Sequence, residues 1–172
     1  DELCAMSAKL IFLRSMFASR NFKEHRVIIF AYHINSMYTL KRLCYLCNVN
    51  CMMINSQTSS IDKDAYLNDF NNPSSDIQVA ILGLESCNKG VTLLVSDIVI
   101  LMEPQALAYK EDQAICRNYR IGQLKRCRVV SILSGDIDVV SFTTARQRAL
   151  SISHALNGGV SFDVPTERLQ NI

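Results

Sequence analysis

Two arginines and a glutamine in one short stretch have the residue types and the spacing for phosphate chemistry. Gln113, Arg117 and Arg120 stand at positions i, i+4 and i+7, so a helix would place one amide and two guanidinium groups on a single face. Gly122 follows as a helix stop, which leaves Arg120 near a loop and free to meet a phosphate. Two arginines on a helix also fit an ordinary solvated face, and the spacing alone leaves both interpretations open.

Five short runs rich in valine and isoleucine predict the buried strands that must position this helix. These runs are 27–32, 49–54, 77–82, 98–102 and 128–133. Helical periodicity occupies the stretches before, between and after them, at 8–18, 36–47, 60–70, 108–120 and 139–156. Strand and helix alternate, which predicts an α/β fold with an open, mostly parallel sheet, helices on both faces and a closing C-terminal helix.

The loops that follow the strands are the expected place for a ligand. In open α/β sheets, ligand sites lie beyond the carboxyl ends of the strands. The loops after Leu82 and Met102, together with the helix ending at Arg120, should therefore meet at one rim of the sheet.

Length and composition favour a single globular domain. The chain has 172 residues, of which 49% are apolar and 20% charged, as in ordinary globular domains. No apolar run reaches about 18 residues without a polar break, so we expect no membrane contact. Residues 1–6 lack the basic and apolar pattern of a secretory signal, so export is not expected either. Seven cysteines, an odd number, indicate reduced thiols in the cytosol or nucleus.

Two further clusters consist of residue types that can bind a metal or a phosphate. Cys44 and Cys47 form one C-x-x-C pair, but a matching second pair is missing, so buried thiols are expected and no metal site. A net charge of +2 is too small to indicate nucleic-acid binding. The positive charges are concentrated, however, and this concentration predicts a patch that faces phosphate. The patch consists of Arg117, Arg120, Lys125, Arg126 and Arg128.

The chain lacks the parts that hold a nucleotide for hydrolysis. A phosphate-cradling G-x-x-x-x-G-K-[ST] motif is absent, and no Asp-Glu pair follows a strand to hold magnesium. We therefore expect no ATP hydrolysis by this chain alone.

The wording Q-A-x-x-R-x-x-R-I-G-Q at 113–123 resembles the last helicase motif of the Swi/Snf-type chromatin-remodelling ATPases, which are built from two RecA-like lobes. Further stretches are similar to that family in the same order, over roughly residues 7 to 150. They are Ser7-Ala-Lys-Leu10, the strand at 26–30, Ile54-Asn-Ser-Gln-Thr-Ser59, the segment 90–97 that begins at Gly90, and the turn at 135–138 before the closing helix.

The resemblance implies that residues 1–157 are the second RecA-like lobe and that 158–172 are a tail. Arg120 would be an arginine finger with Arg117 as its partner, and Gln113 and Gly90 would support the ATP site. ATP and magnesium would be held mainly by a first lobe in the same longer chain, so hydrolysis would need both lobes. The family also implies DNA or nucleosome binding and a nuclear location.

Four hydroxyl residues occupy the family's nucleic-acid positions. By resemblance, Ser56, Thr58, Ser59 and Ser86 would contact the DNA backbone. The first three also directly precede the helix predicted from Ser60, so helix capping explains one or two of them equally well.

Several departures from the family pattern lead to two hypotheses. Leu84-Glu-Ser-Cys-Asn88 replaces (S/T)-x-A-G-G, so a hydroxyl is lost and Glu85 would repel DNA phosphate. The W-N-P motif has become Ala106-Leu-Ala108, and Tyr119 replaces a histidine. The chain is thus either a DNA-dependent ATPase lobe or a non-catalytic RecA-like lobe that binds nucleic acid or protein. A DEAD-box RNA helicase is disfavoured by the wording of 118–123.

Overall fold

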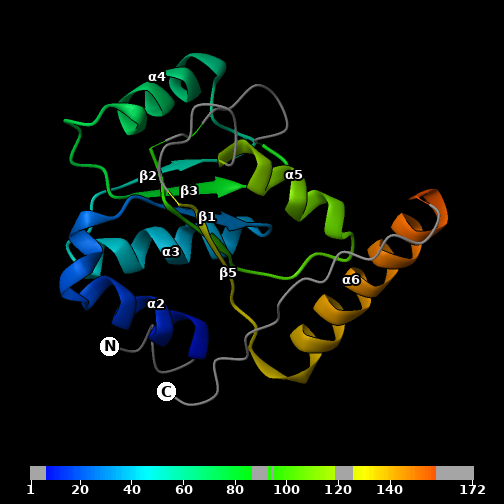
Figure 1. Ribbon diagram of the computed structural model, residues 1–172. Coiled ribbons are helices and arrows are strands. Elements are labelled where there is room, and N and C mark those ends of the chain that lie inside the picture. The colour runs from blue at the N-terminus through cyan, green and yellow to red at the C-terminus, as the bar shows by residue number, and fades with distance from the viewer. Residues whose placement is uncertain (1–6, 87–92, 94, 119–125, 158–172) are drawn as a thin grey trace.

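The computed structural model describes residues 7–86, 93, 95–118 and 126–157, and its centre is a five-stranded parallel sheet (Figure 1). The sheet order is β2-β3-β1-β4-β5. The strands are β1 (Val27–Ala31), β2 (Cys51–Ile54), β3 (Val79–Gly83), β4 (Ile98–Leu101) and β5 (Arg128–Ser131). Every residue of β1, β3 and β4 is buried, which explains their continuous apolar sequence. The α/β fold predicted from the sequence is confirmed.

Helices cover both faces of the sheet, and each face has its own apolar core. Helices α2 (Ala8–Ala18) and α3 (Ile34–Leu46) pack on one face, with side chains such as Leu13 and Leu40 fully buried. Helices α4 (Ser60–Asn71) and α5 (Ala108–Asn118) pack on the other, where Phe70 is fully buried. Alternate residues of the central strands point to opposite cores, as the pleat of a strand requires.

The closing helix α6 (Gly135–Asn157) begins four residues earlier than the expected boundary at 139. Gly135 has φ +77°, a conformation that favours glycine, and the helix continues directly from it. The carboxylate of Asp138 then accepts a hydrogen bond from the Ser134 N–H at 2.9 Å, which stabilises this first turn. Residues 135–138 are therefore part of the helix, where the sequence suggested a turn.

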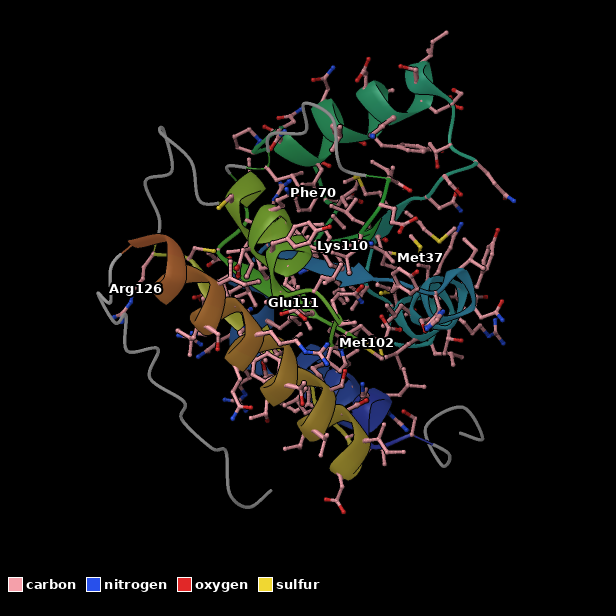
Figure 2. All side chains as sticks on the ribbon, turned by 90° about the vertical axis from the view of Figure 1, so that its right-hand side faces the viewer. Met37, Phe70, Met102, Lys110, Glu111 and Arg126 are labelled. Carbon is pink, nitrogen blue, oxygen red and sulfur yellow. The ribbon has the colours of Figure 1, made fainter. Side chains whose placement is uncertain are left out.

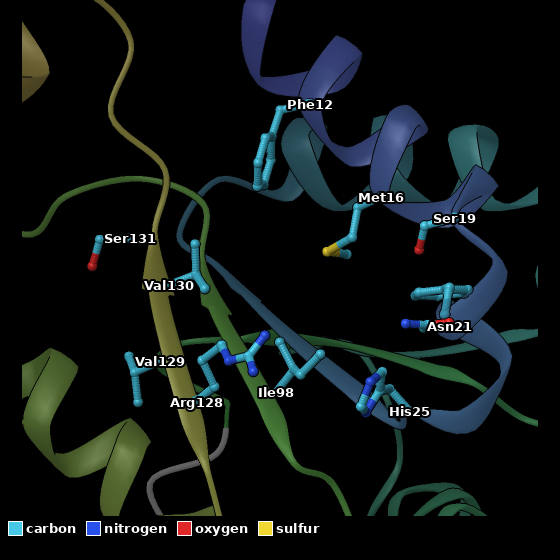
Figure 3. Close-up of a pocket in the computed structure, with 11 residues that line it drawn as sticks. Phe12, Met16, Ser19, Asn21, His25, Ile98, Arg128, Val129, Val130 and Ser131 are labelled. Carbon is cyan, nitrogen blue, oxygen red and sulfur yellow. The ribbon is translucent and has the colours of Figure 1, made fainter. Parts of the chain in front are cut away.

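A short 3-10 helix, η1 (Arg20–Glu24), was not predicted and leads from α2 into β1. Beside it lies a groove of about 830 Å³, with Phe12 and Met16 of α2 on one side and β5 on the other (Figure 3). Arg128 and His25 also line it, and the His25 Nδ1 lies 2.5 Å from the Asp97 Oδ2. Because Arg128 is the first residue of β5, the groove begins at the amino end of the sheet, away from the expected ligand rim.

No helix among the described residues combines the length and the apolar character needed to cross a membrane. The expected tail at 158–172 lies outside the described residues.

Candidate functional site

The carboxyl ends of all five strands lie at one rim, because every strand pairing is parallel. The loops after β3 and β4 leave the sheet there, as the sequence predicted, and so does the loop after β2. Helix α5 lies beyond the arrowheads of β2 and β3 on the same side (Figure 1), and Figure 2 views this rim with Lys110 and Glu111 of α5 near its centre.

The loop after β2 forms a closed turn that fixes one of the predicted hydroxyls. The buried Asn55 accepts a hydrogen bond from the Gln57 N–H at 2.9 Å, and its own N–H donates to the Thr58 Oγ1 at 3.0 Å. Thr58 therefore closes this turn. Ser56, by contrast, is exposed and makes no hydrogen bond with any part of the chain that the structure describes.

Ser59 is the N-cap of α4, so the capping interpretation holds for this residue. Its Oγ accepts from the Asp62 N–H at 3.1 Å and donates to the Asp62 Oδ2 at 2.8 Å. The first of these bonds satisfies an otherwise unpaired amide of the first helical turn. The side chain is nevertheless exposed and lies at the rim.

The turn after β3 explains two departures from the family pattern. Leu84 is buried in the core shared with α4 and α5, so its side chain replaces a hydroxyl with apolar packing. The exposed Glu85 pairs with Lys110 of α5 at 3.3 Å, which partly offsets its negative charge. Ser86 closes the turn by donating its N–H to the Gly83 carbonyl at 3.0 Å. A Cβ on Gly83 would approach the Ser86 Oγ to 3.0 Å, so a side chain there would require the Ser86 hydroxyl to shift.

Three contacts tie the loops of the rim together. Lys63 of α4 donates a hydrogen bond to the Ser86 carbonyl. The Glu85–Lys110 pair links the same turn to α5. Next to β4, the Tyr32 N–H donates to the Glu103 Oε2 at 2.9 Å. The predicted nucleic-acid loops and the start of α5 are thus connected through the side chains of Lys63, Glu85 and Lys110.

Helix α5 exposes Gln113, one of the predicted ATP residues. Gln113 is exposed, and Arg117 follows one turn later on the same face of the helix. The opposite face is buried through Ala108, Glu111 and Ala114, which recur at i, i+3 and i+6. Arg120 and Gly90 lie outside the described residues, as does the side chain of Arg117. Of the five-cation cluster, Arg128 lies at the start of β5, so it is separated from the rim.

A network that the sequence analysis missed holds α5 against α6. The buried Glu111 accepts from the Gln105 N–H at 2.7 Å and from an Arg146 guanidinium nitrogen at 2.9 Å. Arg146 also donates to Asp112 at 2.8 Å. The signal in the sequence was a carboxylate at a buried helical position, which requires a partner. Its partner lies 35 residues away, and no spacing indicated it.

Lys9 ties α2 to the same region. Its Nζ donates to the Met102 carbonyl at 2.9 Å and pairs with the Asp138 carboxylate at 2.6 Å. Partial burial acts to raise the pKa of Asp138, but the hydrogen bonds from Lys9 and from the Ser134 N–H outweigh it and lower that pKa. Lys9 belongs to the motif at 7–10 that carried the family resemblance.

Cys44 and Cys51 form a pair of hydrogen-bonded thiols. Cys44 of α3 is buried, and its contact with Cys51 raises the pKa of Cys44. The same contact, with the help of Lys41 and against the effect of burial, lowers the pKa of Cys51 to about 7. Within the described ranges, no three His, Cys, Asp or Glu side chains gather closely enough to hold a metal ion.

Exposed apolar side chains also occur at the rim. Tyr32 follows β1 directly and is 46% exposed, and Tyr109, in the first turn of α5, is 54% exposed. Leu107, just before α5, is 47% exposed. Exposed apolar side chains mark a docking surface where they form one contiguous patch.

Residues 8–122 match the family of the helicase conserved C-terminal domain. Among curated proteins, the chain is 23% identical over 150 residues to the chromatin remodeling factor mit1 of Schizosaccharomyces pombe, covering 87% of this chain and 11% of mit1. It is 28% identical over 129 residues to the ISWI chromatin-remodeling complex ATPase ISW2 of Saccharomyces cerevisiae, covering 75% of this chain and 12% of ISW2. The chain thus spans only about a tenth of the length of these relatives.

A plant relative and one solved structure agree with these matches. The ATP-dependent helicase BRM of Arabidopsis thaliana is 26% identical over 130 residues, covering 76% of this chain and 6% of BRM. The crystal structure of the C-terminal part of the Fun30 ATPase domain superposes with a TM-score of 0.78 at 21% identity, covering 84% of this chain and 47% of that one. At this identity the likeness shows a shared fold.

Proposed function

Because the chain belongs to the helicase conserved C-terminal domain family and is related to Snf2-type chromatin remodellers, we propose that it works as the second RecA-like lobe of a DNA-dependent ATPase. ATP and magnesium are held mainly by a first lobe in the same longer chain. Arg120, with Arg117 as its partner, stabilises the negative charge that develops on the transferring phosphoryl group. Gln113 and Gly90 support this ATP site.

The exposed face of α5 supports this assignment. Gln113 is open to solvent, so a group at this position of α5 is free to meet a second lobe. A guanidinium fits phosphate because its planar fork spans two oxygen atoms.

The loop hydroxyls provide the contact with DNA in this proposal. Ser56 and Ser59 are exposed at the rim, and Ser86 lies in the neighbouring turn after β3. Hydroxyl groups of this kind bond to phosphate oxygens without reading the base sequence. The substrate is therefore the backbone of double-stranded or nucleosomal DNA, and the place of action is the nucleus.

The single observation that carries the proposal is the connection between the two sets of residues. Lys63 bonds to Ser86, and the adjacent Glu85 pairs with Lys110 at the start of α5. A DNA backbone bound at the loops thus contacts a surface that is linked through these bonds to α5, the arginine helix, on which Arg117 lies. Such a link provides a physical connection through which DNA binding and ATP hydrolysis can be coupled.

One observation favours a second candidate, a non-catalytic lobe that binds nucleic acid or protein. Leu84 has turned into the core where the family has a hydroxyl, and Tyr32, Leu107 and Tyr109 expose apolar surface at the rim. An apolar rim fits a protein partner as well as it fits a first lobe.

ATP turnover by the full-length protein and by this chain, each with and without duplex DNA, separates the two candidates. The first predicts DNA-stimulated turnover by the full-length protein and background turnover by this chain, which lacks a phosphate cradle. Background turnover by the full-length protein, with DNA or partner binding intact, would favour the non-catalytic lobe. Turnover by this chain alone would contradict both.

A further inference from the structure

Helix α5 is attached to the sheet with little apolar burial. The described residues that it buries are Ala108, Ala114 and the acidic Glu111, with Ile115 partly covered. An alanine methyl group removes only a small apolar area from water, so packing alone holds this helix weakly. Its orientation must depend on polar contacts more than that of any helix anchored by leucine or phenylalanine.

Those polar contacts converge on one arginine of α6. Arg146 donates to the Glu111 Oε2 at 2.9 Å and to the Asp112 Oδ1 at 2.8 Å, so its guanidinium spans two consecutive residues of α5. The Glu111 side chain is 2% exposed and that of Arg146 is 30% exposed. Arg146 also lies over the Phe142 ring at 5.5 Å, which fixes its direction. Without this partner the buried carboxylate would keep only the neutral Gln105 N–H, and its charge would be unpaired.

The geometry of a helix relates this contact to the predicted ATP residues. Glu111 and Gln113 are two positions apart, which is about 200° around the helix axis, so they point to nearly opposite sides. Holding Glu111 inward therefore turns Gln113 outward, where it is exposed.

Helix α6 is itself fixed at its start. Lys9 joins Asp138 of α6 at 2.6 Å to the Met102 carbonyl at the end of β4. The segment between β4 and α5 is thus held from both ends, at Met102 through Lys9 and at Gln105 through Glu111. Figure 2 shows α6 beside α5, with Glu111 of α5 labelled between the two helices.

We propose that Arg146 is a positioning residue for the arginine helix: through Glu111 and Asp112 it sets the rotation of α5 that aims Gln113 and the arginines at ATP. The inference rests on the proposed function, because it needs an arginine on α5 or just beyond it to act on phosphate. Arg146 itself touches neither ATP nor the reacting atoms. Its effect belongs to the chemical step, since a small misplacement of a catalytic group costs rate more than binding.

The test uses steady-state ATP hydrolysis by the full-length protein with saturating duplex DNA. Arg146→Met keeps the length of the side chain and removes the charge, and we expect kcat to fall about 10- to 100-fold, with KM for ATP within about threefold. Arg146→Lys retains one charged contact and should recover part of the loss. The matched control is Arg148→Met, because Arg148 lies on the exposed side of the same helix, and it should leave kcat unchanged.

A double variant separates positioning from general weakening. If Arg146 acts through the arginine finger, Arg120→Ala combined with Arg146→Met should be no slower than Arg120→Ala alone. Hydrogen exchange of the same proteins should show faster exchange of α5 amides and unchanged exchange of α4 amides in Arg146→Met. This second measurement does not depend on activity.

Each outcome supports or overturns the inference. If Arg120→Ala lowers kcat and Arg146→Met behaves like Arg148→Met, the positioning role is wrong and the proposed function stands. If the double variant has a lower kcat than Arg120→Ala alone, Arg146 does not act through the arginine finger. If amide hydrogen exchange rises equally in α4 and α5, Arg146 is only a general structural contact. If Arg120→Ala leaves kcat unchanged in an active enzyme, the proposed function and this inference fail together.

Discussion

Helix α3 buries Met37, Leu40, Leu43 and Cys44 against one face of the sheet, whereas α5 buries two alanines and the carboxylate of Glu111 against the other. The first is held by apolar packing, which is strong and has no preferred direction. The second is held by charge-assisted hydrogen bonds, which are directional and depend on a partner in α6. The helix proposed to act on ATP is thus the one whose orientation is set by specific contacts.

The largest effect should come from the apolar helix. Leu40→Ala removes a fully buried side chain from α3 and should lower the free energy of unfolding by about 2–5 kcal/mol, because a cavity is left in the core. Denaturant unfolding measures this. Asn35→Ala, an exposed position on the same helix, is the control and should change the free energy by less than about 0.5 kcal/mol. Equal effects of the two substitutions would contradict the apolar anchoring of α3.

A smaller effect is expected at the start of α4, and it separates capping from DNA contact. Ser59→Ala removes the N-cap bond to the Asp62 N–H and should cost about 1 kcal/mol of stability. Ser56→Ala should leave stability unchanged and weaken binding of a labelled duplex equally for all base sequences, since Ser56 is exposed. If Ser56→Ala binds the duplex like the wild type at low salt, this loop does not contact DNA.

The smallest effect concerns the thiols of Cys44 and Cys51, where a change of reactivity is expected. The pKa of Cys51 is about 7, so its alkylation should be slow below pH 7 and fast above it. Cys44→Ala removes the hydrogen bond that lowers this pKa, so the pKa should rise toward the ordinary value of 9.0 and alkylation at pH 7 should slow. Peptide mapping of alkylated protein measures both. An unchanged pH profile in Cys44→Ala would show that Cys44 does not stabilise the thiolate.

The same contrast explains how far the sequence could predict the fold. All five strands and five of the helices follow from apolar runs and periodicity, because side chains such as Leu40 and Phe70 repeat at the spacing of a buried face. The start of α6 was misplaced because Gly135 was interpreted as part of a turn, although its positive φ begins the helix. The short η1 was missed because five residues carry too little periodicity.

The site was predictable only where a local pattern carries it. Helical spacing predicted that Gln113 and Arg117 share one face of α5; Gln113 is exposed, and the role of this face stays a prediction. The sequence left two interpretations of Ser59, as the N-cap of α4 or as a contact to DNA. The hydrogen bond from the Asp62 N–H supports capping, and the sequence alone did not reveal it. The contacts of Lys9 and Arg146 join residues that are far apart in the chain, at Met102 and Glu111, so they depend on tertiary structure that no spacing reveals.

The central claim is that this lobe supplies an arginine to ATP held elsewhere in the longer chain, and the kinetics of Arg120→Ala in the full-length protein test it most directly. With saturating DNA, kcat should fall by about 10³ or more while KM for ATP changes little, because the interaction is strongest in the transition state. Arg120→Lys should rescue poorly, since an ammonium lacks the planar fork. Arg148→Ala, which removes an exposed arginine of α6, should keep the wild-type kcat. A DNA-stimulated enzyme whose kcat is the same for the wild type and Arg120→Ala would contradict the account.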